Sequence, residues 1–311
     1  MLIVSASEQI KTPTAIALGN FDGIHQGHCS VLRSLIDSVD RDLQPHIHPS
    51  VVSFTPHPRE FFTGEKRSLL TPIPQKAELL ADLGIEQLIL LPFDGDMASL
   101  SPQQFVKEIL VEQLQAKKIC VGKDFRFGYQ RKGTGADLIG LAANYDMEVK
   151  LNSLHTYQNF SAEEVKVSSS LIRQALTEGD IGTADEMLGR AYSLWGKVVT
   201  GKQLGRTIGF PTANLEVAPE KFLPRFGVYA VDVFFATTIL KGIMNIGCRP
   251  TVAGELPTIE VHLLNWSGDL YGQNLRVNII DFIRPEQKFA SVEALKQQIT
   301  QDCRFVMVNY P

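Results

Sequence analysis

The chain of 311 residues lacks the features that define membrane, secreted and disulfide-rich proteins. No apolar run approaches the roughly 20 residues that a membrane-spanning helix needs. The N-terminus has no basic segment leading into an apolar stretch and a small-residue cleavage site, so we expect no signal peptide. The four cysteines are scattered and form no CxxC pair, which argues against a disulfide framework or a zinc site and fits a reducing cytoplasm.

An excess of charge of one sign is also lacking, because 30 Lys and Arg stand against 34 Asp and Glu, for a net charge of −4. This balance argues against a broad basic surface for nucleic acid or anionic lipid, although it is compatible with a local basic pocket. The composition, 44% hydrophobic and 21% charged, is typical of a globular protein. The length suggests two domains.

The first part of the chain alternates strand and helix signals, which predicts βαβ units around a parallel sheet. The expected strands are 14–18, 50–55, 86–91, 117–121 and 148–151. The expected helices are 27–39, 74–83, 102–114, 136–144, 169–177 and 183–188. Residues 101–104, SPQQ, are typical of a capping box with proline at the first helical position. We therefore expect a Rossmann-like, doubly wound α/β domain over residues 1–187.

The pattern changes after Gly189, where strand signals follow one another without helices between them. The expected strands are 194–199, 227–235, 240–246, 258–264 and 275–283. Short strands separated by Gly, Pro and Asn turns predict a small antiparallel β-barrel or sandwich, and a helix beginning near Ser291 closes the chain. We expect this β-barrel domain over residues 188–311.

A glycine- and histidine-rich loop, GNFDGIHQGH at 19–28, follows the first strand and runs into a helix. This is where an open α/β sheet binds ligands, and the N–H groups at a helix start attract phosphate. His25 and His28 are three residues apart, so on a helical turn they share a face and can meet one phosphate chain. A glycine-rich turn with two partly buried histidines is the plainer alternative, and a zinc site would need a third ligand that is not evident nearby.

The loop resembles the HxGH signature of the nucleotidyltransferase superfamily, and more narrowly the GNFDGxHxGH form of bacterial FAD synthetases. The resemblance implies that His25 and His28 stabilise the nucleotide phosphates as pyrophosphate leaves, so that catalysis is mainly positioning and charge stabilisation. The residues implied to bind the nucleotide here are Gly19, Asn20, Phe21, Asp22, Gly23 and Gly27.

The segment VGKDFRFGYQRKG at 121–133 carries four basic residues against one acidic residue and resembles the GxDFxFG core of the same family. That resemblance implies nucleotide contacts for Asp124 and Arg126 and a flavin contact for Phe127, whereas a solvated charged loop is the alternative.

Two further segments match the same family. SSSLIR at 168–173 resembles the family's SSTxIR signature, which implies ATP phosphate contacts for Ser169 and Arg173, whereas helix capping is the alternative. Pro56 and His57 match a loop implied to contact the flavin.

The second half has its own glycine-rich loop, GRTIGFPTAN at 205–214, which is not a Walker P-loop. Turns between strands would explain the glycines alone, but the run resembles the riboflavin kinase signature. The residues implied to bind nucleotide phosphates are Gly205, Arg206 and Gly209. Thr212 and Asn214 are implied to bind Mg²⁺, a cation that prefers hard oxygen ligands.

TIEVHLL at 258–264 and NIGCRPT at 245–251 extend the riboflavin kinase resemblance. Strand alternation places Glu260 and His262 on one face, which could also be a solvated polar face. The resemblance implies that Glu260 is the catalytic base for the ribityl 5′-hydroxyl of the flavin, a task that suits a carboxylate. It also places Arg284 near the flavin.

The combined resemblance implies two consecutive reactions. The C-terminal domain would phosphorylate riboflavin with MgATP to FMN, and the N-terminal domain would transfer AMP from a second ATP to FMN, giving FAD and pyrophosphate. We expect Mg²⁺ as cofactor, riboflavin, FMN and ATP as small-molecule substrates, no nucleic-acid or membrane partner and a cytoplasmic location. Oligomeric state is left open, including weak self-association.

Three alternatives remain open at this point. One is a monofunctional nucleotidyltransferase with a structural or flavin-sensing barrel, and another is a flavin-binding sensor without catalysis. The third is a nucleic-acid-binding barrel, for which no stripe of aromatic and basic residues is evident.

Overall fold

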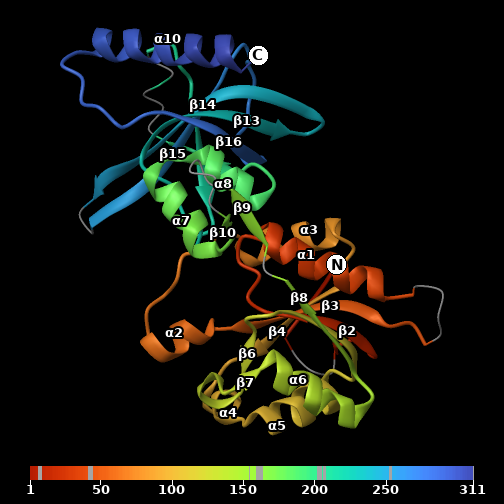
Figure 1. Cartoon of the computed structure of the whole chain (residues 1–311). Coiled ribbons are helices and arrows are strands. Elements are labelled where there is room, and N and C mark those ends of the chain that lie inside the picture. Colours follow the sequence, from red (N-terminus) through yellow and green to blue (C-terminus); the bar gives the residue numbers. More distant parts are fainter. Residues whose placement is uncertain are drawn as a thin grey trace. The chain divides into compact units, whose positions relative to one another are not determined.

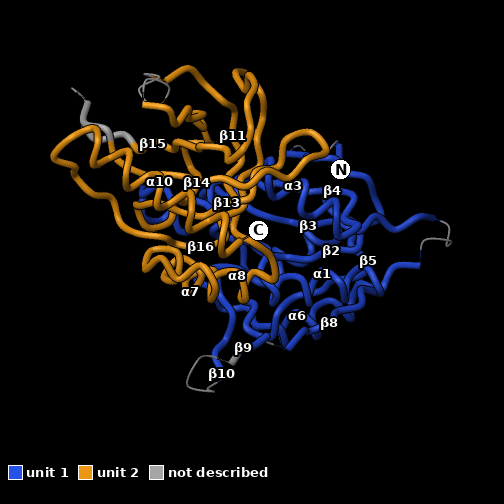
Figure 2. The backbone as a smooth tube through the Cα atoms, turned by 90° about the horizontal axis from the view of Figure 1, so that it is seen from above, with its two compact units in different colours: residues 1–168 blue, residues 169–311 orange. Residues whose placement is uncertain are grey.

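The computed structural model describes residues 1–5, 9–40, 45–153, 155–158, 164–201, 205, 208–251 and 254–310, with only the backbone described at 249–251 and 254–256. The chain divides into two compact units, residues 1–168 and residues 169–311 (Figure 2).

The first unit is built on a six-stranded parallel sheet with the order β1-β4-β3-β2-β5-β8 (Figure 1). The strands are β1 Leu2–Val4, β2 Thr14–Leu18, β3 His48–Thr55, β4 Gln87–Pro92, β5 Ala116–Gly122 and β8 Glu148–Asn152. The chain moves outward from β2 to β3 and β4, then returns to the other side of β2 as β5 and β8. The point where this order reverses, at the carboxyl edge between β2 and β5, is the expected ligand crevice of an open α/β sheet.

Successive side chains of β2 reach two different layers of helices. Ala15 and Ala17 pack in a core cluster with side chains of α1 (Gln26–Ser38) and α3 (Ile73–Asp82). Ile16 and Leu18 pack in a second cluster with α6 (Gly135–Ala142) and the π-helical segment η2 (Phe105–Gln113). Every residue of β2 is buried because helices cover both faces of the sheet. The predicted doubly wound α/β domain is confirmed.

Shorter elements complete the first unit. They are α2 Pro58–Thr63, α4 Gly95–Ser99, α5 Pro102–Gln104, β6 Arg126–Phe127, η3 Tyr129–Arg131, β7 Gly133–Thr134, η4 Ala143–Tyr145, β9 Thr156–Gln158 and β10 Glu164–Lys166. The capping box predicted at residues 101–104 is present, with Ser101 and Gln104 bonded reciprocally to each other's backbone N–H.

The second unit contains a closed antiparallel barrel with the strand order β11-β12-β15-β14-β13-β16. Its strands are β11 Ser193–Val199, β12 Ala213–Val217, β13 Gly227–Phe235, β14 Thr238–Thr251, β15 Gly254–Leu263 and β16 Asn274–Arg284. Closure leaves no unpaired strand edge. The sequence pattern predicts five of these strands and misses β12, because β12 begins inside the glycine-rich loop.

The last helix, α10 (Val292–Asn309), lies against the outer wall of the barrel (Figure 1). Val228 and Ile243 of the barrel form a core cluster with Cys303 and Val306 of this helix. The side chain of Ser291 caps its first turn by accepting the Ala294 N–H. The predicted barrel with a terminal helix is confirmed.

Helices α7 (Ser169–Glu178) and α8 (Ile181–Leu188) belong to the second compact unit, since α8 contacts β16. The division between the two compact units therefore precedes these helices, whereas the predicted boundary at residue 187 lies in the last turn of α8.

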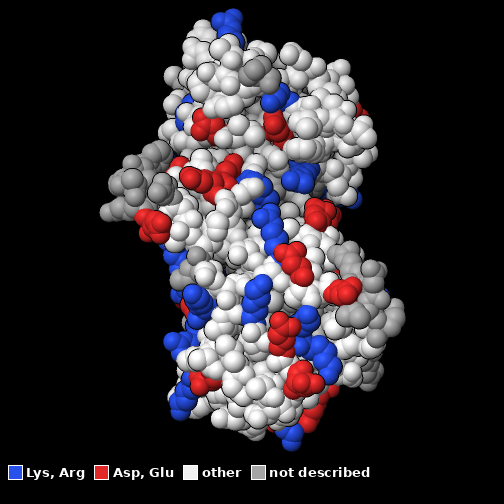
Figure 3. Space-filling view, turned by 45° about the vertical axis from the view of Figure 1, so that its right-hand side comes forward, with Lys and Arg blue, Asp and Glu red and all other residues white. Residues whose placement is uncertain are grey.

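No helix within the described part of the chain is long and apolar enough to cross a membrane. On the face seen in Figure 3, Lys and Arg are interspersed with Asp and Glu.

Candidate active sites

The 19–28 loop leaves β2 through a backbone that few sequences adopt. Phe21 and Ile24 have positive φ angles of 47° and 42°, although neither is glycine. Both side chains are buried, at 3% and 2% exposure, and pack in the cluster under α1. Strained backbone of this kind persists only where its surroundings hold it. The two buried side chains therefore fix the shape of a loop that lies at the switch point of the sheet.

His25 and His28 form a stacked pair at the start of α1. Their ring centroids are 3.6 Å apart with an angle of 15° between the planes. The Nδ1 of His25 accepts the backbone N–H of His28 at 3.3 Å, so His25 is the N-cap of the helix. A neutral His25 therefore carries its proton on Nε2, which can donate to a phosphate oxygen. A Cβ at Gly27 would lie 3.2 Å from the His25 ring, so glycine at this position gives the ring its space.

A buried network supports the same loop from α3 and the segment before it. Asp22 accepts the Thr71 N–H at 3.1 Å, and Thr71 Oγ1 accepts the Gly23 N–H at 2.9 Å. Lys76 Nζ donates to the carbonyl oxygen of Asn20 at 2.7 Å. Burial lowers the pKa of Lys76, which is 5% exposed, although the Asp22 charge acts in the opposite direction. The sequence gives no signal for Thr71 or Lys76, because each reaches the loop from more than 40 residues away.

The structure brings two of the predicted binding segments together at neighbouring strand ends. Asn20, after β2, is hydrogen-bonded through Nδ2 to Nε2 of His57, after β3, at 2.9 Å. Burial and the nearby Arg67 charge lower the pKa of His57, so its ring is neutral near pH 7. Pro56 is exposed beside it.

An aromatic cluster that the sequence analysis did not identify lies close by. Phe61 and Phe62 of α2 are 39% and 69% exposed, and both rings contact Phe93, with centroids 5.5 and 5.9 Å away. Exposed aromatic rings at the carboxyl edge of a sheet offer flat apolar surface to a ring-shaped ligand.

The basic segment after β5 divides into exposed and buried residues. Asp124 and Arg126 are exposed, and Asp124 forms an ion pair with Lys166. Phe127 is 5% exposed and packs against Phe105 in the core, with ring centroids 5.6 Å apart. The observed contacts of Phe127 are thus packing contacts, and its implied contact with flavin stays a prediction.

Ser169 and Arg173 lie on α7 in the second unit. Arg173 Nη1 donates to the Ser169 carbonyl oxygen at 3.2 Å, and its guanidinium lies 5.7 Å from the centre of the Phe222 ring. Their implied contact with ATP also stays a prediction.

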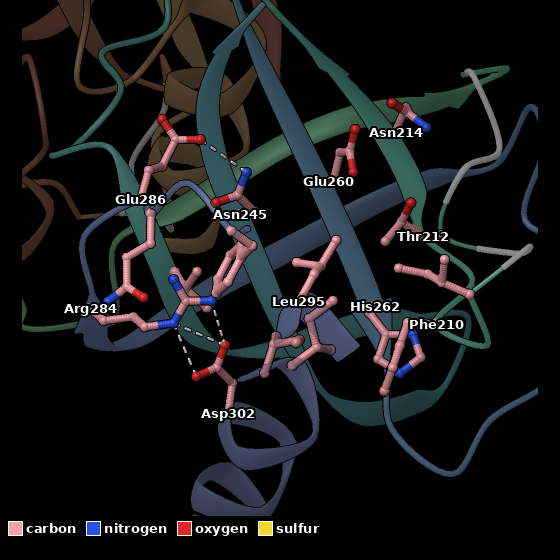
Figure 4. Close-up of a pocket in the computed structure, with 17 residues that line it drawn as sticks. Phe210, Thr212, Asn214, Asn245, Glu260, His262, Arg284, Glu286, Leu295 and Asp302 are labelled. Atoms are coloured by element: carbon pink, nitrogen blue, oxygen red, sulfur yellow. Dashed lines mark hydrogen bonds and ion pairs between the residues drawn. The ribbon is translucent and has the colours of Figure 1, made fainter. Parts of the chain in front are cut away.

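Glu260 stands in a row of three polar residues that crosses three neighbouring barrel strands. It pairs with Asn214 of β12 on one side and with Asn245 of β14 on the other. Directly paired residues point to the same face of a sheet, and these three line one cavity of about 400 Å³ (Figure 4). That volume lies within the range of small-molecule sites.

The rest of the cavity lining contains both polar and apolar side chains. The polar residues are Thr212, His262, Arg284, Glu286, Gln287 and Asp302. The apolar residues are Ile208, Phe210, Val228, Ile243, Phe289, Leu295 and Ile299. A flat apolar ring system with a polar chain would fit such a lining.

Close backbone approach explains why glycines stand beside the polar row. A Cβ at Gly201 would collide with the Asn214 side chain, and one at Gly205 would lie 3.2 Å from Thr212 Oγ1. Gly205 lines the cavity and Gly209 does not. Arg206 lies outside the described residues.

Arg284 of β16 is held by Asp302 of α10 through both carboxylate oxygens. Asp302 also accepts the side-chain amide of Gln298 at 2.9 Å and is 2% exposed. The Arg284 side chain thus joins the barrel to α10 at the wall of the cavity.

A second cavity of about 370 Å³ shares Thr212 with the first. Ala213 and Val261, which alternate with Thr212 and Glu260 along their strands, line it together with Trp266 and Tyr271. Thr212 therefore lines two ligand-sized cavities.

One unit has a parallel sheet with a phosphate-suited loop at its switch point, and the other has a closed barrel with a carboxylate-lined cavity. Together they define a nucleotide-handling transferase of two units. The sequence matches the FAD synthetase family over residues 7–171 and the riboflavin kinase family over residues 188–309.

Whole-chain comparisons agree with these matches. The chain is 39% identical over 293 residues to the bifunctional riboflavin kinase/FMN adenylyltransferase of Escherichia coli (strain K12), with 92% of this chain and 90% of that protein covered. It is 36% identical over 290 residues to the protein of the same name from Haemophilus influenzae, with 93% and 91% covered. The chain therefore belongs to the family of bifunctional riboflavin kinase/FMN adenylyltransferases, which are ATP-using transferases.

The structure is also similar to the crystal structure of a macrolide-efflux protein from Streptococcus pneumoniae. The TM-score is 0.86 at 31% identity, and 100% of this chain and 99% of that chain are covered. This similarity supports the fold of both units, while efflux is stated only in the name of that protein.

Proposed function

We propose that the second unit phosphorylates riboflavin with ATP to FMN and that the first unit joins FMN to AMP from a second ATP, giving FAD and pyrophosphate. The observation that carries the proposal is that the chain holds two separate constellations. One is the stacked His25 and His28 pair at the start of α1, and the other is Glu260 in the barrel cavity. Each constellation suits one of the two reactions.

In the kinase reaction, Glu260 accepts the proton of the ribityl 5′-hydroxyl as the hydroxyl oxygen attacks the γ-phosphorus of ATP, and the bond from this phosphorus to the β-phosphate breaks as ADP leaves. The apolar residues of the larger cavity contact the flavin ring, and the smaller cavity takes the nucleotide, with Thr212 lining both. The side-chain oxygens of Thr212, Asn214 and Glu260 are hard donors that fit Mg²⁺. When bound, Mg²⁺ neutralises phosphate charge.

In the adenylylation reaction, a phosphate oxygen of FMN attacks the α-phosphorus of ATP, and the bond to the β-phosphate breaks as pyrophosphate leaves. His25 and His28 donate hydrogen bonds to these phosphates, and the N-terminus of α1 adds its free N–H groups. The aromatic rings of Phe61 and Phe62 offer a surface for the flavin ring. Asp124 and Arg126 are the further proposed nucleotide contacts of the first unit, while the ATP contacts of Ser169 and Arg173 stay predictions from the sequence.

The four cysteines are scattered along the sequence and form no CxxC pair, which supports a reducing cytoplasm as the working location. The near balance of 30 Lys and Arg against 34 Asp and Glu supports small-molecule substrates.

The test is a time course of the purified protein with riboflavin, ATP and Mg²⁺, with the flavins separated by HPLC. We expect FMN first and FAD after it, with pyrophosphate released in step with FAD. If FMN accumulated and no FAD formed, the chain would have only the riboflavin kinase activity. FAD made only from added FMN would leave a monofunctional nucleotidyltransferase with a flavin-sensing barrel.

A further inference from the structure

Two histidines and a glutamate meet at the amino edge of the parallel sheet, whereas the 19–28 loop lies at its carboxyl edge. His46 Nε2 lies 2.9 Å from one carboxylate oxygen of Glu86, and His48 Nδ1 lies 2.7 Å from the other. The ligand atoms of all three side chains lie within 4.8 Å of one another. Within the part of the chain that the structure describes, no other group of three His, Cys, Asp or Glu side chains converges in this way.

The backbone holds these side chains in place from two different strands. His48 is the first residue of β3, and its N–H donates to the Pro13 carbonyl oxygen at 2.9 Å. Glu86 directly precedes β4, where its N–H donates to Pro49 O and its carbonyl oxygen accepts the Leu2 N–H, both at 2.9 Å. Hydrogen bonds of the sheet thus fix the backbone of two of the three residues, His48 and Glu86, which is part of the pre-organisation that a ligand set needs.

The geometry is close to that of a metal site. Zinc bound to nitrogen and oxygen at about 2.0–2.2 Å in a tetrahedron separates its ligand atoms by about 3.3 Å. Widening the two nitrogen–oxygen distances by roughly 0.5 Å would therefore admit an ion. The two imidazole rings stand nearly perpendicular, at 83°, and Nε2 of His46 and Nδ1 of His48 both face the Glu86 carboxylate. Their side chains are 29% and 18% exposed and that of Glu86 is 36% exposed, which leaves room for water as a further ligand.

We propose that His46, His48 and Glu86 bind a divalent transition-metal ion, with Zn²⁺ the chemically preferred occupant. Two imidazoles and one carboxylate suit Zn²⁺ and its neighbours in the series, whereas Mg²⁺ prefers oxygen ligands throughout. The site lies at the opposite end of β3 from His57, roughly 25 Å away for a strand of this length. An ion bound there would link the starts of β3 and β4. This site is separate from that of the metal of the kinase reaction.

The test uses the full chain, stripped of metal with a chelator and dialysed. Titration with Co²⁺ should give the visible bands of a four- or five-coordinate ion and saturate at one ion per chain, and Zn²⁺ should abolish the bands. The double variant His46→Ala/His48→Ala should weaken Co²⁺ binding more than about 100-fold. Glu86→Gln can still form hydrogen bonds with the histidines, but it should also weaken Co²⁺ binding. This variant tests the proposal if the double variant does not fold.

The matched control is His25→Ala/His28→Ala, which removes the other close histidine pair and should bind Co²⁺ as the wild type does. Zn²⁺ at a hundredfold excess over its dissociation constant should raise the unfolding temperature of the wild type by about 5 °C and leave that of Glu86→Gln unchanged. Equal Co²⁺ binding by the wild type and Glu86→Gln would overturn the proposal, as would loss of binding in the control. Because no readout depends on FMN or FAD formation, this outcome is independent of the proposed function.

Discussion

Arg284 of β16 and Asp302 of α10 form a buried pair, with Arg284 Nε 3.1 Å from both carboxylate oxygens and Nη2 2.7 Å from Oδ2. Removing the carboxylate with Asp302→Ala leaves the Arg284 charge unpaired in a site where it is largely buried. Loss of a buried partner costs about 3–5 kcal/mol. We expect a lower free energy of unfolding of the second unit and a raised KM for riboflavin, because α10 forms one wall of the cavity.

Chemical denaturation and kinase kinetics would measure both effects. Glu293→Gln changes an exposed acid on the same helix and is the control. A riboflavin KM equal in Asp302→Ala and Glu293→Gln would show that the pair does not shape the flavin pocket.

The buried Lys76 holds the 19–28 loop through the Asn20 carbonyl oxygen. Lys76→Met keeps the length and apolar body of the side chain and loses the donor. A small misplacement of a catalytic loop lowers rates by up to about 100-fold. We therefore expect slower FMN adenylylation with unchanged riboflavin phosphorylation. Lys107→Met alters an exposed lysine of η2 and should change neither rate. Adenylylation as fast in Lys76→Met as in Lys107→Met would refute this role.

Gly201 lies where a Cβ would collide with the Asn214 side chain. Gly201→Ala should push Asn214 away from Glu260, and we expect kinase activity to fall by about 100-fold while adenylylation continues. The comparison variant is Gly182→Ala, where the nearest atom to an added Cβ lies 4.0 Å away. Steady-state rates with riboflavin and with FMN separate the two activities. Full kinase activity in Gly201→Ala would mean that Asn214 need not keep its position.

Burial raises the pKa of Asp185 to about 7, although the hydrogen bond from the Tyr192 N–H and the Arg190 charge each act to lower this pKa. The folded pKa is above the ordinary value of 3.8, so folding takes up a proton between these two pH values. The stability that this group contributes is fully present below about pH 4 and is lost as pH rises to about 7.

Urea denaturation of the wild type and Asp185→Asn across this range measures the effect. The wild type should lose stability relative to Asp185→Asn as pH rises from 4 to 7, and the difference should then stay constant. A difference that does not change with pH would mean that Asp185 ionises as an ordinary exposed carboxyl does.

Much of the fold follows from local patterns in the sequence. The buried β2 is a short apolar run that ends at Gly19, and α10 begins after a capping serine at 291. The edge strand β1 was missed because it is only three residues long, and two of these, Leu2 and Ile3, are exposed.

Some residues of the candidate sites could likewise be predicted from local sequence patterns, and others could not. The histidines of the 19–28 loop and Glu260 lie within continuous motifs, so residue order alone reveals them. The contact of Lys76 with Asn20 joins residues 56 positions apart, and that of His48 with Glu86 joins residues 38 positions apart. Only the folded sheet brings these residues together.

The central claim is that two constellations carry two separable reactions, and two variants of one chain test it most directly. His28→Ala and Glu260→Ala would each be assayed by HPLC with riboflavin and, separately, with FMN as the flavin substrate. We predict that His28→Ala forms FMN and no FAD, whereas Glu260→Ala forms FAD from FMN and no FMN from riboflavin. Equal loss of both activities in either folded variant would contradict the account.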